Sequence, residues 1–191
     1  MKKSIKIALF IALLLIIDQT IKILVKTNMP FGKEIPFLGL GWFQLVFVEN
    51  NGMAFGMEFG SKTILTLFRL IISGLMLYYI IRLIKNNYGT AYILCVSLIF
   101  AGAIGNIIDC VFYGLIFGES SFLNGRVVDM FQFQVTYPSW LPYLSGKQIF
   151  DPVFNFADSC ITIGIFVLIL FFRKDFNQTF DEIFSKKKAE K

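Results

Sequence analysis

Histidine is absent from the 191 residues of this chain. Its absence excludes Ser-His-Asp and Cys-His catalysis, zinc proteases of the HExxH type and any proton relay that depends on imidazole. Cysteine is also scarce, because Cys95, Cys110 and Cys160 lie far apart and form no CxxC pair. We therefore expect no metal site and no cofactor. A thiol oxidoreductase remains open only if two of these distant cysteines meet.

Charge is scarce as well. Only 16% of the residues are charged and 56% are hydrophobic, whereas about a quarter of the residues of a soluble domain are charged. The composition therefore predicts one membrane-embedded domain over residues 1–191. The net charge of +5 comes mostly from lysines and arginines near the two ends, as the positive-inside rule predicts for cytoplasmic termini. We expect membrane lipid, and no nucleic acid, as a partner.

Four apolar runs cover about residues 5–25, 64–84, 91–112 and 152–172, and about 20 apolar residues in a helix cross a bilayer. The first run is too long for the core of a signal peptide and no small-x-small cleavage site follows it, so we expect it to be retained. The connection between the second and third runs is basic, with Arg82 and Lys85. Both termini and the basic tail 173–191, a predicted exposed helix or disordered segment, are therefore expected in the cytoplasm.

This topology leaves two longer segments outside, at about residues 27–63 and 113–151. Residues 42–48 are aromatic and β-branched and are bounded by glycines, which predicts a strand, and residues 53–59 could form a second. Residues 126–133, followed by Pro138, Trp140 and Pro142, form an apolar segment with turn breakers that we expect to rest at the membrane interface.

Three carboxylates lie inside the apolar runs, all toward their outer ends: Asp18, Asp109 and Asp158. A charged residue within a span costs about 2.5 to 3.5 kcal/mol on insertion scales, so it usually faces the bundle interior or a wet cavity. Side chains at one depth on three helices can converge on a single site. Asp129, just outside the third span, is within reach of that site if its loop folds back.

The polar residues of the third and fourth runs follow helical spacing. Asn106 and Asp109 share one face of the third, and Asn155 and Asp158 share one face of the fourth. Asp151–Pro152 predicts the start of the fourth helix, with the aspartate as N-cap and proline in the first helical position.

Two carboxylates held close together share one proton and can act as base and acid in turn, which is the chemistry of aspartic peptide hydrolysis. From depth and spacing alone, two further interpretations remain open. The same residues could form a structural polar network within the bundle. They could also line an ion path in a small transporter, although all of the carboxylates lie on one side.

Five motifs, in order along nearly the whole chain, resemble those of the lipoprotein signal peptidases, the type II signal peptidases of bacteria. Residues 18–22 (DQTIK) resemble the DQxxK of that family and residues 50–56 (NNGMAFG) resemble its NxGxAFG. The other three are residues 105–109 (GNIID), which resemble GNxxD, 127–130 (VVDM), which resemble VVDF, and 154–158 (FNFAD), which resemble FNxAD.

The resemblance implies that Asp129 and Asp158 are the catalytic pair of an intramembrane aspartic endopeptidase. It implies supporting roles for Asn106, Asp109, Asn155, Asp18, Lys22 and Ala157, although Asp18 and Lys22 could also be a plain i,i+4 helix pair. Residues that would line the substrate path or bind substrate are Asn50, Gly52, Phe55 and Arg126.

The family removes signal peptides from lipoprotein precursors and cuts before a cysteine that carries a diacylglyceryl group. The resemblance therefore implies four transmembrane helices with a small extracytoplasmic β-cradle, built partly from residues 42–59. It also implies a monomer in the bacterial inner membrane, with its site near the outer face.

Two positions depart from the family pattern. Cys110 stands where the family usually carries an arginine, and about ten residues are inserted between Leu115 and Arg126. A carboxylate pair with one negative charge benefits from a nearby cation. We therefore expect Arg126, next to the VVD motif, to supply it, unless it is a plain interfacial arginine.

Overall fold

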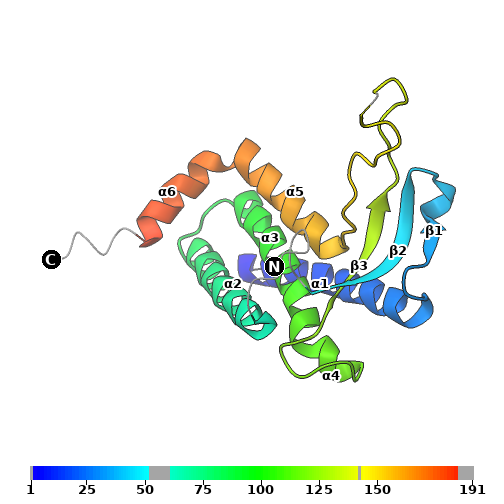
Figure 1. The fold of residues 1–191 in the computed structure, drawn as a ribbon. Coiled ribbons are helices and arrows are strands. Elements are labelled where there is room, and N and C mark those ends of the chain that lie inside the picture. The colour runs from blue at the N-terminus through cyan, green and yellow to red at the C-terminus, as the bar shows by residue number, and fades with distance from the viewer. Residues whose placement is uncertain (1, 52–60, 142, 185–191) are drawn as a thin grey trace.

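The computed structural model describes residues 2–51, 61–141 and 143–184 (Figure 1). The long helices are α1 (Lys3–Asn28), α2 (Lys62–Lys85), α3 (Thr90–Ile108), α5 (Phe156–Phe171) and α6 (Arg173–Phe184). A π-helical turn (Asp109–Tyr113) and the short α4 (Gly114–Ile116) extend α3. A three-stranded sheet consists of β1 (Glu34–Pro36), β2 (Phe43–Asn50) and β3 (Val127–Phe133), and a 3-10 turn (Phe37–Gly39) follows β1.

Three helices of the described residues are long and apolar enough to cross a membrane: α1, α2 and α3 with its extension. The fourth predicted span is shorter than expected, because α5 has 16 residues. It passes the same test only together with α6, from which a bend of 94° separates it. Most of the long apolar side chains on the outside of α1, α2 and α5 are exposed, as expected for surfaces that face lipid.

The start of α5 differs from the prediction at Asp151–Pro152, which was wrong. The helix begins at Phe156 and Asn155 is its N-cap. The Asn155 side chain accepts the backbone N–H of Asp158 at 2.9 Å, and the Asp158 carboxylate accepts the backbone N–H of Asn155 at 3.1 Å. This reciprocal capping box satisfies two N–H groups at once. Residues 152–154 are extended instead, because Phe154 pairs with Phe131 of β3.

The sheet is antiparallel in the order β1-β2-β3. The strand predicted at residues 42–48 is confirmed as β2, whereas the second strand predicted at 53–59 lies outside the described residues. Residues 127–133, predicted only as an interfacial segment, form β3. Its first four residues are all buried, so the strand lacks the apolar-polar alternation by which half-buried strands are recognised.

Close packing of α3 against α1 and α5 depends on two glycines. A Cβ atom at Gly102 would lie 2.4 Å from the backbone oxygen of Ala157, and one at Gly105 would lie 2.6 Å from Oδ2 of Asp18. Both distances are far shorter than a normal contact, so only glycine fits. The glycines therefore bring the polar residues of α1, α3 and α5 within hydrogen-bonding distance.

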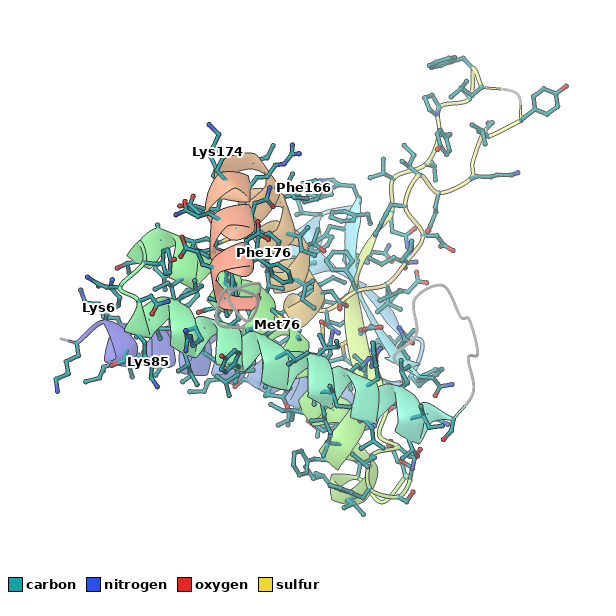
Figure 2. All side chains as sticks on the ribbon, turned by 90° about the vertical axis from the view of Figure 1, so that its left-hand side faces the viewer. Lys6, Met76, Lys85, Phe166, Lys174 and Phe176 are labelled. Carbon is teal, nitrogen blue, oxygen red and sulfur yellow. The ribbon has the colours of Figure 1, made fainter. Side chains whose placement is uncertain are left out.

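The end of the bundle away from the sheet holds the N-terminus, the α2–α3 connection and α6 (Figure 2). Lys3 Nζ donates to Asn87 Oδ1 at 2.6 Å and to the backbone oxygen of Tyr88 at 2.8 Å. The tail was predicted to be exposed, but α6 packs on the bundle and Thr179 is 1% exposed. Lys6 and Lys85 lie next to each other at this end, whereas Lys174 lies apart from them at the start of α6 (Figure 2).

Candidate active site

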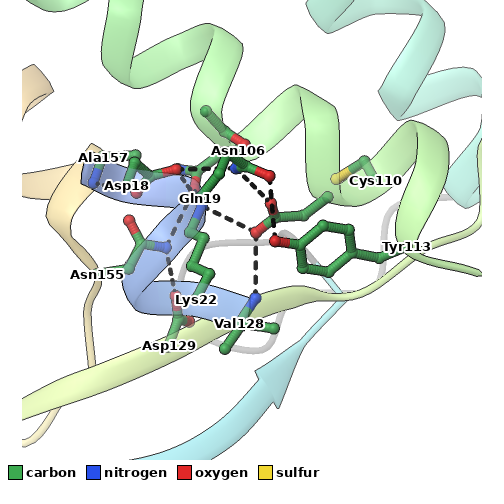
Figure 3. Close-up of polar contacts among 12 residues, drawn as sticks. Asp18, Gln19, Lys22, Asn106, Cys110, Tyr113, Val128, Asp129, Asn155 and Ala157 are labelled. Carbon is green, nitrogen blue, oxygen red and sulfur yellow. Dashed lines mark hydrogen bonds and ion pairs between the residues drawn. The ribbon is translucent and has the colours of Figure 1, made fainter. Parts of the chain in front are cut away.

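The C-terminal parts of α1 and α3 meet around a lysine that is completely buried. Lys22 Nζ lies 3.0 Å from Asp18 Oδ2 and 2.8 Å from Asp109 Oδ2, and it donates to Asn106 Oδ1 at 2.9 Å (Figure 3). The Lys22 side chain is 0% exposed. An ammonium group can occupy such a place only if its donors are satisfied, so Lys22 holds the two helices in a defined relative position.

Gln19 is a member of this network that sequence reasoning did not single out. Its Nε2 donates to Asp18 Oδ2 and Asp109 Oδ1, both at 3.0 Å, and to the backbone oxygen of Gly105 at 3.1 Å. Its Oε1 accepts the hydroxyl of Tyr113 at 3.0 Å. The available signal was its place inside the DQxxK-like motif, three residues before Lys22.

Asp129 lies on β3 and is 3% exposed. Its Oδ1 accepts from Asn155 Nδ2 at 2.6 Å and its Oδ2 accepts from Asn50 Nδ2 at 3.2 Å. Burial, followed by the nearby charge of Asp158, raises the pKa of Asp129 to about 7, although the two amide donors and the Lys22 charge act in the opposite direction. Asp129 is therefore a carboxyl group that is largely protonated just below neutral pH.

Asp158 reaches the same place from the first turn of α5. Its Oδ1 accepts from Asn106 Nδ2 at 2.8 Å, and its Oδ2 accepts the backbone N–H of Asn155. The Asn155 amide also donates to Asn106 Oδ1 at 3.0 Å. The two asparagines thus link both carboxyl groups, and Asp158 is the more exposed of the two. Each of its oxygens accepts one hydrogen bond.

The remaining supporting residues hold the backbone around this pair. Asp109 is completely buried, and besides Lys22 its Oδ2 accepts the backbone N–H of Val128 at 3.3 Å. Asp18 Oδ1 accepts the backbone N–H of Ala157 at 3.0 Å. Asp18 and Asp109 therefore position the residues immediately before Asp129 and Asp158.

The residues predicted to bind substrate are placed less uniformly. Asn50 contacts Asp129, whereas Gly52 and Phe55 lie outside the described residues. Arg126 is at the surface, with 57% of its side chain exposed, and its Nη1 lies 3.2 Å from Glu49 Oε2. The position of Arg126 does not support the hypothesis that it supplies a cation to the carboxylate pair.

Other chemistries find less support in this geometry. All three cysteines are described, and each is buried and unpaired. Cys95 Sγ donates to the backbone oxygen of Gly164 instead. Among residues 2–51, 61–141 and 143–184, no three or more carboxylates and thiols are grouped so as to hold a metal ion. The distinguishing feature is a pair of carboxyl groups linked through two asparagine side chains, at the end of the bundle that carries the sheet.

Comparison with known proteins shows the family to which this chain belongs. The sequence model of signal peptidase (SPase) II matches residues 10–174. A lipoprotein signal peptidase of Porphyromonas gingivalis is 46% identical over 185 residues, covering 86% of this chain and 81% of the relative. One of Amoebophilus asiaticus is 38% identical, over 84% of this chain and 75% of that protein. The chain belongs to the signal peptidase II family. The resemblance seen in the five motifs is thereby confirmed.

Solved structures agree with this assignment. A bacterial membrane enzyme determined by the in meso method at 2.3 Å resolution superposes with a TM-score of 0.66 at 27% identity, covering 97% of this chain and 93% of that one. A second, at 1.9 Å, gives a TM-score of 0.63. Membership of the family makes this chain a membrane-bound protease that removes signal peptides from prolipoproteins.

Proposed function

We propose that this protein is an aspartic endopeptidase that cuts diacylglyceryl-modified prolipoproteins before the lipid-modified cysteine, with Asp129 and Asp158 as its catalytic pair. The observation that carries the proposal is the linkage of these two carboxyl groups through Asn106 and Asn155. The charge of Asp158 also acts on Asp129, and two carboxyl groups that interact electrostatically titrate as a pair that can hold one proton between them. The raised pKa of Asp129 supports its role as the member that holds the proton.

The chemistry follows from this distribution of charge. Asp158 accepts a proton from a water molecule while the water oxygen attacks the scissile carbonyl carbon. Asp129 donates its proton to the carbonyl oxygen, which gives a tetrahedral diol. On collapse Asp129 takes back a proton from the diol, the C–N bond breaks, and Asp158 donates its proton to the leaving amine of the cysteine. Each carboxyl group ends in its starting state.

The supporting network gives this pair its geometry. Lys22 ties Asp18 on its own helix to Asp109 on α3, and those two carboxylates bind the backbone beside each catalytic residue. Catalytic groups must be held to within a fraction of an ångström, so such buried cross-links serve catalysis through rigidity. Asn50, which donates to Asp129, is proposed to border the substrate path with Gly52 and Phe55.

We further propose that the site lies near the outer face of the bacterial inner membrane and that both termini are cytoplasmic. Lys6 on α1 and Lys85 on α2 lie together at the ends of these helices away from the site (Figure 2), and positive charge marks the cytoplasmic side. A substrate that is anchored in the outer leaflet by two acyl chains would approach through lipid. We expect the enzyme to act as a monomer and to need no cofactor.

A reconstituted cleavage assay tests this function. Purified protein in lipid is given a synthetic precursor with or without the diacylglyceryl group, and products are identified by mass. We expect cleavage of the modified precursor alone, directly before the modified cysteine, and full activity in strong chelators. Equal cleavage of the unmodified precursor, or a cut elsewhere, would contradict the proposal.

The topology is tested separately. A reporter that is active only in the cytoplasm should work when it is fused after Lys191 and fail when it is inserted near Ser121. The opposite pattern would place the site on the wrong side for an exported precursor.

A further inference from the structure

The second arginine near the site is Arg69, on α2. It is half-buried and lies seven residues beyond the start of α2 at Lys62, or about 10 Å along the helix axis at 1.5 Å per residue. Its Nη1 lies 3.3 Å from the sulfur of Cys110. Cys110 is the position at which the family pattern usually carries an arginine, so a guanidinium group is present here after all, from another helix.

Arg69 lies on the side of α2 that faces the protein. Lys62, Thr66 and Arg69 are spaced i, i+4 and i+7 and therefore share one face. Lys62 Nζ donates to Asn51 Oδ1 at 3.4 Å, and Thr66 Oγ1 donates to the backbone oxygen of Leu123 at 3.1 Å. The apolar neighbours on the other faces of α2 are largely exposed, as expected for contact with lipid.

A short chain of contacts leads from Arg69 to the catalytic pair. Cys110 directly follows Asp109, the carboxylate that accepts the backbone N–H of Val128, and Val128 precedes Asp129. From the other direction, Asn51, which binds Lys62 at the start of α2, directly follows Asn50, which donates to Asp129. The face of α2 that carries Arg69 therefore borders the site, and Cys110 lies at the border of the network in Figure 3.

Among the residues that the structure describes, the contact with Cys110 is the one hydrogen bond that the Arg69 guanidinium group makes. A guanidinium carries five N–H donors, and a thiol is a weak acceptor. No carboxylate among the described residues lies within 4 Å of Arg69. A cation at this depth in a membrane helix is costly unless it faces a wet cavity or a partner. Arg69 thus has the position and the donors to bind an oxygen acceptor that arrives with the substrate.

We propose that Arg69 is a substrate-binding residue, whose guanidinium donates to a carbonyl oxygen of the lipid-modified segment and takes the place of the family arginine at position 110. This inference rests on the proposed function. The carbonyl belongs either to the peptide next to the cut or to an ester of the diacylglyceryl group. Both are hydrogen-bond acceptors that the bound substrate brings to the site.

The test compares steady-state kinetics of the full-length protein in lipid, with the diacylglyceryl precursor as substrate. Arg69→Gln is expected to raise KM by about 10-fold to 100-fold with little change in kcat, because a charge-assisted hydrogen bond to bound substrate is lost. Arg69→Lys keeps the positive charge but not the planar guanidinium group, so its KM should lie between those of the wild type and Arg69→Gln. Arg82→Gln, on the same helix at its opposite end, is the matched control and should leave KM unchanged.

A second variant separates binding from a structural role. In the double variant Cys110→Arg, Arg69→Gln, a guanidinium returns from α3, and KM should recover in part. A dialkyl ether precursor, which lacks the ester carbonyls, identifies the acceptor. An effect of Arg69→Gln that disappears with this precursor assigns the ester, and an effect that persists assigns the peptide carbonyl.

Failure of the proposed function and failure of the role of Arg69 give different results. If the wild-type protein does not cleave the precursor, the proposed function is wrong. If the wild type cleaves and a folded Arg69→Gln variant has the wild-type KM, the role of Arg69 is overturned. The same conclusion holds if Arg69→Gln lowers thermal stability and kcat together and Cys110→Arg restores nothing.

Discussion

The two ends of the helix bundle both bury polar side chains, but one end buries neutral groups and the other buries ionisable groups. At the end that carries α6, the hydroxyls of Tyr79, Tyr92 and Thr179 bond to one another, with 3.0 Å between Tyr92 and Thr179. These groups are neutral, and all three contacts join different helices. This cluster fixes α6 on α2 and α3 without placing any charge in the interior.

The other end carries the sheet and, in the proposed topology, is the outer end of the bundle; it buries several ionisable groups. Asp18, Asp109, Asp129 and Asp158 gather there, and Lys22 is the one cation within salt-bridge distance of any of them among the described residues. Asp18 and Asp109 are paired with Lys22, whereas within the described part of the chain Asp129 and Asp158 accept only from side-chain amides and the backbone. We attribute this imbalance to the catalytic role proposed for Asp129 and Asp158, because perturbed carboxyl groups are frequent at functional sites.

The largest effect on stability is expected at the cation of the outer end. Lys22→Met leaves Asp18 and Asp109 buried without a counter-ion, and removing one partner of a buried ion pair costs about 3 to 5 kcal/mol. We expect a strong loss of thermal stability in detergent, accompanied by loss of cleavage. Stability within about 1 kcal/mol of wild type, the scale of a surface ion pair, would show that the ion pairs at this end are dispensable.

The next effect is a pH dependence that only the outer end should show. As the acid, Asp129 must be protonated, and its pKa is raised to about 7 from 3.8. Cleavage should therefore fall about tenfold per pH unit above that value. Because the folded-state pKa lies above the unfolded one, the protonated carboxyl stabilises the fold at low pH, and this contribution is lost as pH rises through about 7. A flat profile of kcat/KM from about pH 6 to 9 would contradict the assignment of Asp129 as the acid.

A smaller effect is expected at the neutral cluster. Thr179→Val removes one hydroxyl from a network of three and should cost about 1 to 3 kcal/mol of stability, because it leaves tyrosine hydroxyls with fewer partners. Cleavage kinetics measured at a temperature where the variant is folded should equal those of wild type. A change in kcat of such a folded variant would mean that the two ends are coupled. The neutral cluster would then affect cleavage as well as stability.

The smallest effect concerns the pH above which cleavage falls, which is the alkaline limb of the pH profile. Asn50 donates to the Asp129 carboxylate and so favours its ionised form. Asn50→Ala should raise the pKa of Asp129 and move the alkaline limb of the cleavage profile to higher pH, by up to about one unit. A shift to lower pH would show that the amide acts on Asp129 in some other way.

Much of this contrast was predictable from local patterns. The apolar runs locate α1, α2 and α3, and helical spacing puts Asn106 and Asp109 on one face. Charges inside apolar runs point to the outer site because their insertion is costly. The motif order then identifies Asp129 and Asp158 as the residues to bring together, and the fold does bring them to one network.

Other features depend on tertiary contacts and left no local signal. Asp151–Pro152 fits the sequence pattern of a helix N-terminus, but α5 begins after Asn155. The capping box of Asn155 is compatible with the pairing of Phe154 to β3. The burial of Thr179 needs partners on α2 and α3 that sequence spacing cannot show. Arg126 is adjacent to the site in sequence yet pairs with Glu49 at the surface, whereas distant Arg69 reaches Cys110.

The central claim is that Asp129 and Asp158 act together, and turnover of the diacylglyceryl precursor by Asp129→Asn and Asp158→Asn tests it most directly. Each substitution keeps the size of the side chain and removes one half of the proton-sharing pair. Both variants should insert and fold, yet turn over at less than about one hundredth of the wild-type rate. A folded variant of either residue that exceeds this rate would contradict the account.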